Sequence, residues 1–194
     1  WVPDSVTWVD MLPTEIGARW VPSSRDIARS PVLLAAPTTG KYAGSPRPTS
    51  WATLINEQGD IRMVNPDVES TGRLVFDTAR AASPGSLGLA VAERFIFMSR
   101  FAGENTTTLL DGALTYPDYR PFPVSEQVLS TWAKDHPGIL DPLMPVEGTP
   151  TLDYPWITAP GLSPEQSAAA SDLFRSLTSE AGRKDLQAAG FRSP

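Results

Sequence analysis

Three short segments of the chain place hydroxyl and carboxyl side chains where helices are expected to begin. They contain the residues Asp4 and Ser5; Ser70, Thr71 and Gly72; and Ser125 and Glu126. A helix start presents backbone N–H groups that have no partner inside the helix, and it lies at the positive end of the helix dipole. An anion, or a polar solute with hydrogen-bond acceptors, can bind there without a charged side chain. The pattern therefore predicts reversible ligand binding at these segments.

Two residues extend this prediction. Gly72 falls in the first turn of its helix, where the missing side chain would let a ligand approach the backbone. Tyr154 begins the last expected strand and could line a ligand cleft. The alternative is purely structural, because Ser, Thr and Asp are the usual helix caps and also stabilise turns. Both interpretations stay open for each of the three segments.

Catalysis would require more than these segments supply. The only histidine, His136, lies in the sequence Asp-His-Pro-Gly, which resembles a helix end, where a cation is favourable. A hydrolase that uses Ser5 or Ser125 would need His136 within hydrogen-bond reach, and the sequence does not bring them together. One histidine and no cysteine make no metal cluster, and no phosphate-loop or dinucleotide glycine pattern occurs. We therefore expect no enzyme, no metal and no cofactor.

The composition of the chain limits the classes of partner that it could bind. The 194 residues include 16 basic and 22 acidic side chains, which leaves a net charge of −6 and argues against nucleic acid. No apolar run reaches the 18 or so residues that a membrane-spanning helix needs, so we expect membrane association only through segments outside this sequence. The chain starts at Trp1 without methionine or signal peptide, and we interpret it as a piece of a longer product.

Apolar patterning predicts the elements that position these segments. Strands are expected at residues 1–2, 32–36, 61–64 and 154–158, and helices at 6–11, about 70–82, 87–101 and 125–135. Residues 103–108 and 111–123 are expected to be irregular. Strands that alternate with helices predict an α/β architecture with a largely parallel sheet.

The C-terminal region predicts two capped helices. Ser163, Pro164 and Gln166 form a capping-box pattern at the start of the first helix. Four of its apolar residues recur at helical spacing and should bury one stripe, namely Ala170, Leu173, Phe174 and Leu177.

The second helix has signals at both ends. Ser179 can cap its start, and Gly190 fits the left-handed position that often follows a helix. Phe191 can then fold back onto Leu186, in the contact that accompanies this ending.

Several segments, in this order, resemble a known family. They are WVPDSVTW (1–8), IARSPVLLAAP (27–37), SWATLI (50–55), NPDVESTGRLVFDTAR (65–80), FPVSEQVL (122–129) and the block 154–192. Together they resemble the type II periplasmic, or extracellular, solute-binding-like domain. More narrowly, they resemble the version that actinobacteria often place before a von Willebrand factor A domain.

The resemblance implies a two-lobed fold of type II periplasmic-binding-protein kind. Residues 1–36 would belong to lobe 1, 37–138 to lobe 2, and 139–194 would return to lobe 1. The chain crossings near 30–37 and 139–148 would form a hinge, and the N-terminal part of lobe 1 would lie outside this sequence. Helix starts such as those above would then face the cleft between the lobes.

The implied function is capture of a small polar or anionic ligand outside the cytoplasm, without covalent chemistry. An alternative stays open because a fold does not fix a function. The chain could be a protein-interaction or structural module that keeps the fold without a ligand, and this alternative predicts an exposed apolar patch.

Overall fold

A computed structural model of the chain describes residues 1–17, 19–40, 43, 50–51, 61–82, 85–99, 105–116 and 118–194. The chain forms two compact units. Unit 1 comprises Trp1–Ser30 and Leu152–Pro194, and unit 2 comprises Pro31–Thr151. The expected division into lobes and a hinge stays a prediction. No helix among the described residues is long and apolar enough to cross a membrane.

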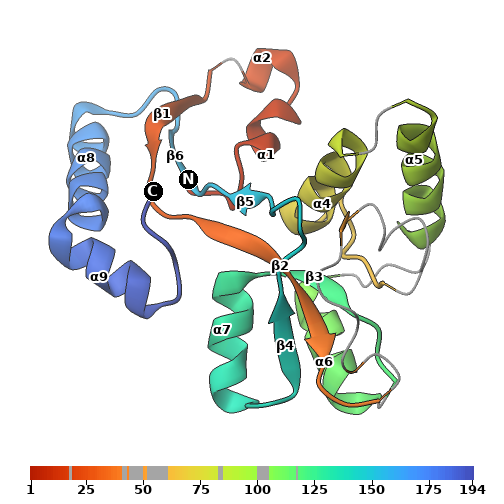
Figure 1. Cartoon of the computed structure of the whole chain (residues 1–194). Helices are drawn as coiled ribbons and strands as arrows, with labels where there is room; N and C mark the ends of the chain where they lie inside the picture. The colour runs from red at the N-terminus through yellow and green to blue at the C-terminus, as the bar shows by residue number, and fades with distance from the viewer. Residues whose placement is uncertain are drawn as a thin grey trace. The chain divides into compact units, whose positions relative to one another are not determined.

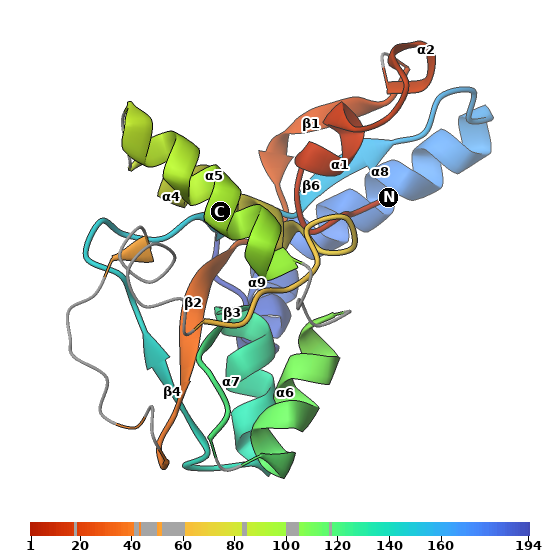
Figure 2. The ribbon, with the colours of Figure 1, turned by 90° about the vertical axis from the view of Figure 1, so that its right-hand side faces the viewer.

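Unit 1 is built on a pair of strands. Its elements are α1 (Thr7–Asp10), α2 (Thr14–Gly17), β1 (Val21–Asp26), β6 (Pro155–Thr158), α8 (Pro164–Thr178) and α9 (Glu180–Ala188). β1 and β6 pair antiparallel, with Val21 opposite Thr158 and Asp26 opposite Pro155. Figures 1 and 2 show α8 beside this strand pair. A buried cluster of Ile27, Ala28 and Trp156 joins the strands to α8 and α9.

The caps of α8 and α9 are confirmed. Ser163 accepts a hydrogen bond from the backbone N–H of Gln166, whose side chain accepts one from the backbone N–H of Ser163. Ser179 caps α9 by accepting from the Gly182 N–H at 3.1 Å.

The ending of α9 is confirmed as well. Gly190 has a φ of 92°, and the backbone N–H of Phe191 donates to the Leu186 carbonyl.

The expected stripe of α8 is only partly correct. Ala170, Phe174 and Leu177 pack against the unit 1 cluster, but Leu173 is 53% exposed. Leu173 therefore lies outside the part of the apolar face that packs against the unit 1 cluster.

Unit 2 has a sheet in which β2 (Ser30–Pro37) is central. β3 (Phe122–Ser125) and β4 (Leu140–Leu143) flank β2, and β5 (Thr151–Leu152) also pairs with it. Every residue of β2 is buried, which confirms the strand expected at 32–36.

Among the described residues, the helices that accompany this sheet are α4 (Ser70–Ala81), α5 (Ser86–Ser99), α6 (Thr106–Thr115) and α7 (Glu126–Asp135). Figure 2 shows α6 and α7 together beside β2, β3 and β4. Helices α4 and α7 both contact β3.

The α/β class is confirmed, but the expectation of a largely parallel sheet is wrong. The pairs β1–β6, β2–β3 and β2–β4 are all antiparallel. Alternating strands and helices favour parallel pairing only when each helix is a crossover between neighbouring strands. Here the strands that pair with β2 are contributed by a distant part of the chain, which returns in the opposite direction.

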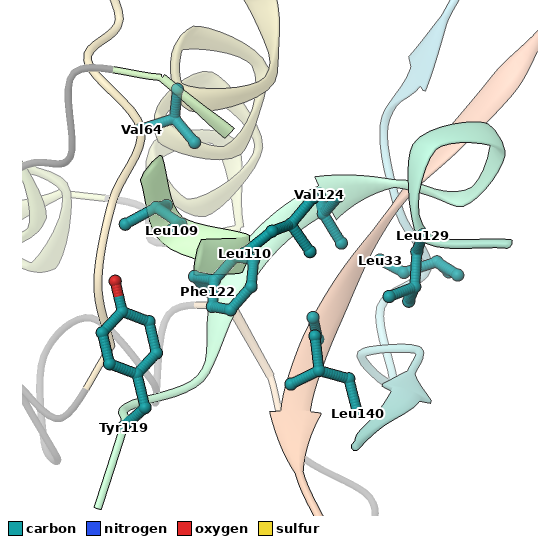
Figure 3. Close-up of a cluster of buried hydrophobic side chains, with 10 residues drawn as sticks. Leu33, Val64, Leu109, Leu110, Tyr119, Phe122, Val124, Leu129 and Leu140 are labelled. Carbon is teal, nitrogen blue, oxygen red and sulfur yellow. The ribbon is translucent and has the colours of Figure 1, made fainter. Parts of the chain in front are cut away.

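The core of unit 2 lies between the sheet and its helices (Figure 3). Its buried members are Leu33, Ala35, Val64, Leu109, Leu110, Tyr119, Phe122, Val124, Leu129 and Leu140. Val124 and Leu129 lie on opposite sides of the Ser125 cap, as expected for a hydrophobic staple.

Helix α6 corrects the expectation that residues 103–108 and 111–123 are irregular. Asn105 caps α6 by accepting from the Thr108 N–H at 2.9 Å. Leu109 and Leu110 are buried in the unit 2 core. Threonines at a helix start lower the intrinsic propensity, but burial of the two leucines supplies the stability that the local sequence lacks.

The strands expected at residues 1–2 and 61–64 are not formed, although both segments make backbone hydrogen bonds to other parts of the chain. Trp1 donates its amine to the Ile157 carbonyl and accepts from the Ile157 N–H, yet no strand forms because Pro3 and the following turn end the pairing. At 61–64, only Val64 makes a bridge, while the Arg62 N–H donates to Pro121. Strand β1, which begins with Val-Pro-Ser-Ser, was not predicted because its sequence is too polar.

Candidate functional site

Three predicted residues of unit 1, Asp4, Ser5 and Tyr154, lie in one connected corner together with Asp153. We call these four residues the Asp4–Tyr154 corner. The Tyr154 N–H donates to the Asp4 carbonyl at 3.4 Å. The Asp153 carboxylate accepts from the Val6 N–H at 3.2 Å, at the start of α1. Two turns far apart in the sequence are thereby held side by side.

Within this corner the polar groups already have partners. The Asp4 carboxylate accepts from the indole N–H of Trp8 at 2.6 Å, and the Ser5 hydroxyl accepts from the Thr7 N–H at 3.3 Å. These contacts match the structural interpretation of the turn. A ligand could still bind here, because a carboxylate oxygen and a hydroxyl each accept more than one hydrogen bond.

Tyr154 has an unusual backbone conformation, with a φ of 37°. This left-handed region is sparsely populated by residues other than glycine and involves strain that clusters at functional positions. The aromatic ring packs edge-on against Phe191 at 5.0 Å. Burial of the Tyr154 side chain raises its pKa to about 12, and the charge of Asp4 acts in the same direction.

Asp153 was not among the predicted site residues. Burial raises the pKa of its carboxyl, and the charge of Asp26 raises it further. The hydrogen bonds from the Val6 N–H and from Ser5 act in the opposite direction. The sequence signal that could have identified it is only its position next to Tyr154 in the turn before β6.

Unit 2 contains the other two predicted segments. Ser70, Thr71 and Gly72 open α4 and are all buried. Ser125 ends β3 and caps α7, where its hydroxyl accepts from the Val128 N–H at 3.3 Å. Glu126 follows it in the first turn of α7. Because α4 contacts β3, the structure brings elements of both segments together in one unit.

The start of α4 has no side-chain cap. Its N-cap residue is Glu69, whose carboxylate instead accepts from the backbone N–H and the hydroxyl of Thr106. The Glu69 carboxylate therefore satisfies a backbone N–H at the start of α6. It does not cap α4, the helix that Glu69 itself precedes. Glu69 was not among the predicted site residues. Glutamate is not one of the usual N-cap residues, so the sequence offers no capping signal at this position.

The structure explains why position 72 is occupied by glycine. A Cβ atom at this position would lie 2.3 Å from the backbone carbonyl oxygen of Val64. The close approach that glycine permits here is thus an approach of the protein's own chain. Whether Gly72 also contacts a ligand stays a prediction.

His136 ends α7. Its Nδ1 lies 3.1 Å from the Trp132 carbonyl oxygen, and the ring stacks on Trp132 with centroids 4.4 Å apart. In the described part of the chain, His136 makes no hydrogen bond to a serine hydroxyl. The described residues also contain no group of three side chains able to hold a metal ion.

Two cavities formed by described residues each lie within a single unit, and none of their described lining residues is a predicted site residue. The first has a volume of about 460 Å³ between β6 and α8 of unit 1, with Trp156 and Phe174 in its wall. The second has a volume of about 310 Å³ in unit 2, near the end of β2.

Comparison with protein-family models identifies the family of this chain. The family model described as bacterial extracellular solute-binding protein matches residues 1–192. No curated protein matches the chain. Among solved structures, an extracellular solute-binding protein from Bordetella parapertussis is similar with a TM-score of 0.60 and 16% identity, over 97% of this chain and 60% of that one.

Two further structures show the same fold. The sulfate-binding protein SubI from Mycobacterium tuberculosis H37Rv has a TM-score of 0.61 and 15% identity, over 86% of this chain and 57% of that one. A periplasmic thiamin-binding protein has a TM-score of 0.67 and 9% identity, over 87% of this chain and 52% of that one. The chain therefore spans only somewhat more than half the length of these proteins.

Proposed function

Because the chain belongs to the bacterial extracellular solute-binding protein family, we propose that it captures a small polar or anionic solute outside the cytoplasm. In this proposal the ligand lies between two lobes that close around a hinge. Candidate contacts are the Asp4–Tyr154 corner, the start of α4 and the start of α7. The protein performs no covalent chemistry, and the solute passes to a transporter.

One observation carries this proposal. In each unit, candidate residues lie next to the points where the chain passes between units. In unit 2, Ser125 pairs with Val32, one residue past the first crossing. In unit 1, Tyr154 follows the second crossing by two residues. A site placed at the connections is the arrangement that lets hinge motion open and close around a ligand.

The donors available in unit 2 favour a ligand that accepts hydrogen bonds. Helix α4 has 12 residues, no acidic residue in its first turn and no side-chain cap. Its first-turn N–H groups lie at the positive end of the helix dipole, which favours an anion or a polar acceptor. Ser70 and Thr71 add hydroxyls at the same place.

A thermal-shift series tests the proposal with sulfate, phosphate, molybdate and thiamin as probes. The first, third and fourth are suggested by solved structures of similar fold that are described as sulfate-binding, molybdenum-transporter and thiamin-binding proteins. A probe present at about 100 times its Kd should stabilise the protein by ~2.7 kcal/mol. If no probe raises the melting temperature, capture of these solute classes is excluded.

Single substitutions test whether the solute binds at the start of α4. Thr71→Val keeps the shape of the side chain and removes its hydroxyl, so affinity should fall by about tenfold if a hydrogen bond is lost. Ser130→Ala, on the exposed side of α7, is the matched control and should bind as the wild type does. Equal affinity of all three proteins would show that the ligand does not touch the start of α4.

A second function has one observation in its favour. Unit 1 exposes the large apolar side chains Trp1, Met11 and Ile16. Such residues, when contiguous, mark protein–protein contacts. A non-catalytic interaction module, including one joined to a von Willebrand factor A domain, remains the alternative proposal. Capture of a defined envelope partner by the wild type, lost in Ile16→Ser, would support it.

A further inference from the structure

A cavity of about 310 Å³ lies within unit 2 at the end of β2. It is lined by the end of β2, the end of α6 and the turn between α7 and β4, comprising Pro37, Thr38, Thr39, Ala113, Leu114, Thr115, Tyr116, Gly138 and Ile139. Figure 1 shows these three segments close together. Pro37 pairs with Leu140, whereas Val32, near the other end of the strand, pairs with Ser125. The cavity is therefore separate from the start of α7.

One wall of this cavity is an aromatic platform. Tyr116 is 60% exposed, and its ring is stacked in parallel on Tyr119, with 6.2 Å between centroids and 11° between planes. Tyr119 is buried and fixed from two sides. A Cβ atom added at Gly112 would lie 2.4 Å from its ring, and the Arg62 guanidinium lies 4.5 Å from its centre. Figure 3 shows Tyr119 at the margin of the core. The exposed ring of Tyr116 thus rests on a rigid base.

Three threonines also line this cavity, namely Thr38, Thr39 and Thr115. Thr38 fixes the opposite wall, because its hydroxyl donates to the Gly138 carbonyl at 2.5 Å and its N–H donates to Ile139 at 3.1 Å. The Thr115 hydroxyl donates to the Asp111 carbonyl at 2.8 Å, so its oxygen can still accept. Among the described residues, the hydroxyls of Thr39 and Tyr116 make no hydrogen bond.

The described residues that line the cavity include no charged side chain. A bound ion would therefore find no partner charge among these residues. The hydroxyls of Thr39 and Tyr116 offer hydrogen bonds that a purely apolar ligand would not use. The wall suits a neutral molecule that has one apolar face and a rim of hydroxyl groups. The volume lies at the lower end of the roughly 300–1,000 Å³ usual for ligand pockets.

We propose that this cavity binds a neutral sugar ring. The C–H face of a pyranose lies on Tyr116, and its hydroxyls bond to Thr39, Thr115 and the Tyr116 hydroxyl. This site is independent of the proposed solute site, and both could be occupied in one molecule.

Saturation-transfer NMR on the full chain tests the proposal, with methyl β-D-glucopyranoside, N-acetylglucosamine and cellotriose as probes. We expect saturable binding of at least one probe in the range of about 1 mM, with the ring C–H protons receiving most of the transfer. The affinity should not change between low and high salt, because no ion pair is involved.

Four variants separate the contribution of the Tyr116 ring from that of other residues. Tyr116→Ala should lower the affinity at least about tenfold by removing the platform, whereas Tyr116→Phe should lose less because the ring remains. Met144→Ala, which removes another exposed apolar side chain of unit 2, should bind as the wild type does. Thr71→Val should also bind sugar normally, whatever its effect on the proposed solute site.

The proposal is overturned if no probe binds at about 10 mM, or if Tyr116→Ala binds as tightly as the wild type. It is also overturned if hexaproline peptide occupies the cavity and the sugars do not, since the surface would then be a protein-docking site.

Discussion

The carboxylate of Glu69 accepts two hydrogen bonds from Thr106, one from the backbone N–H at 2.8 Å and one from the hydroxyl at 2.5 Å. Glu69 is the N-cap residue of α4, and Thr106 is the first residue of α6. The side chain of Glu69 therefore connects the start of α4 to the start of α6 through hydrogen bonds. The negative charge also lies at the positive end of α6, where it is stabilising.

The Glu69→Gln variant should lower the free energy of unfolding by about 1–3 kcal/mol, because both hydrogen bonds lose their charged acceptor. Urea unfolding followed by circular dichroism measures this change. Glu93→Gln removes an exposed helical carboxylate from α5 and should change stability by less than about 0.5 kcal/mol. A double-mutant cycle with Thr106→Val should show coupling between the two sites. Additive effects would mean that the contact contributes nothing.

Gly72→Ala should destabilise the protein by about 3 kcal/mol, at the upper end of overpacking effects. The new methyl group would meet the Val64 carbonyl, which is backbone and cannot rotate away. Asp77→Ala, on the exposed face of α4, is the control and should be nearly neutral. A Gly72→Ala protein of wild-type stability that fails to bind solute would instead show that Gly72 faces the ligand.

The Asp153 carboxyl should make stability depend on pH. Burial raises its pKa above the ordinary 3.8, so the folded state holds this proton more tightly than the unfolded state does. Asp153 therefore stabilises the folded state at pH values below 3.8, the ordinary pKa of the carboxyl. This stabilisation is lost as the pH rises through the raised pKa of the folded state.

Asp153→Asn removes this titration and can keep the hydrogen bond from the Val6 N–H. The stability of the variant relative to the wild type should therefore increase as the pH rises from about 4. Urea midpoints measured across this range test the prediction. Asp10→Asn, at an exposed carboxyl of α1, serves as the control. A wild type that gains stability relative to Asp153→Asn over the same interval would refute it.

Ser163→Ala should lower stability by about 1 kcal/mol, because the capping box of α8 is lost. Ser171→Ala changes a serine in the interior of the same helix, where alanine has the higher helix propensity, and should be neutral or slightly stabilising. Thermal unfolding of the two variants provides the measurement. Equal losses in both would indicate an effect of hydroxyl removal in general, without a special role for the cap.

The elements that were predicted correctly are those whose signals are local. The capping box at Ser163, the cap at Ser125 and the glycine ending at Gly190 depend on residues within one or two turns of each other. The buried run of β2 is equally local, because five consecutive apolar residues between prolines indicate one strand.

The elements that were missed depend on distant partners. Strand β1 exists through its pairing with β6, and α6 exists because Leu109 and Leu110 are buried in the unit 2 core. For the candidate site, the sequence identified the helix starts but not Asp153 or Glu69. These two carboxylates accept hydrogen bonds from the backbone N–H groups of Val6 and Thr106, which lie far away along the chain.

By itself, the sequence determined an α/β protein of the solute-binding kind with hydroxyl-rich helix starts, because caps, periodicity and segment order are properties of neighbouring residues. Only the tertiary structure decided that the strands pair antiparallel, that Gly72 makes room for Val64, and that Tyr116 lies exposed over a fixed Tyr119. These features arise where segments from different parts of the chain meet, and local sequence does not encode which segments those are.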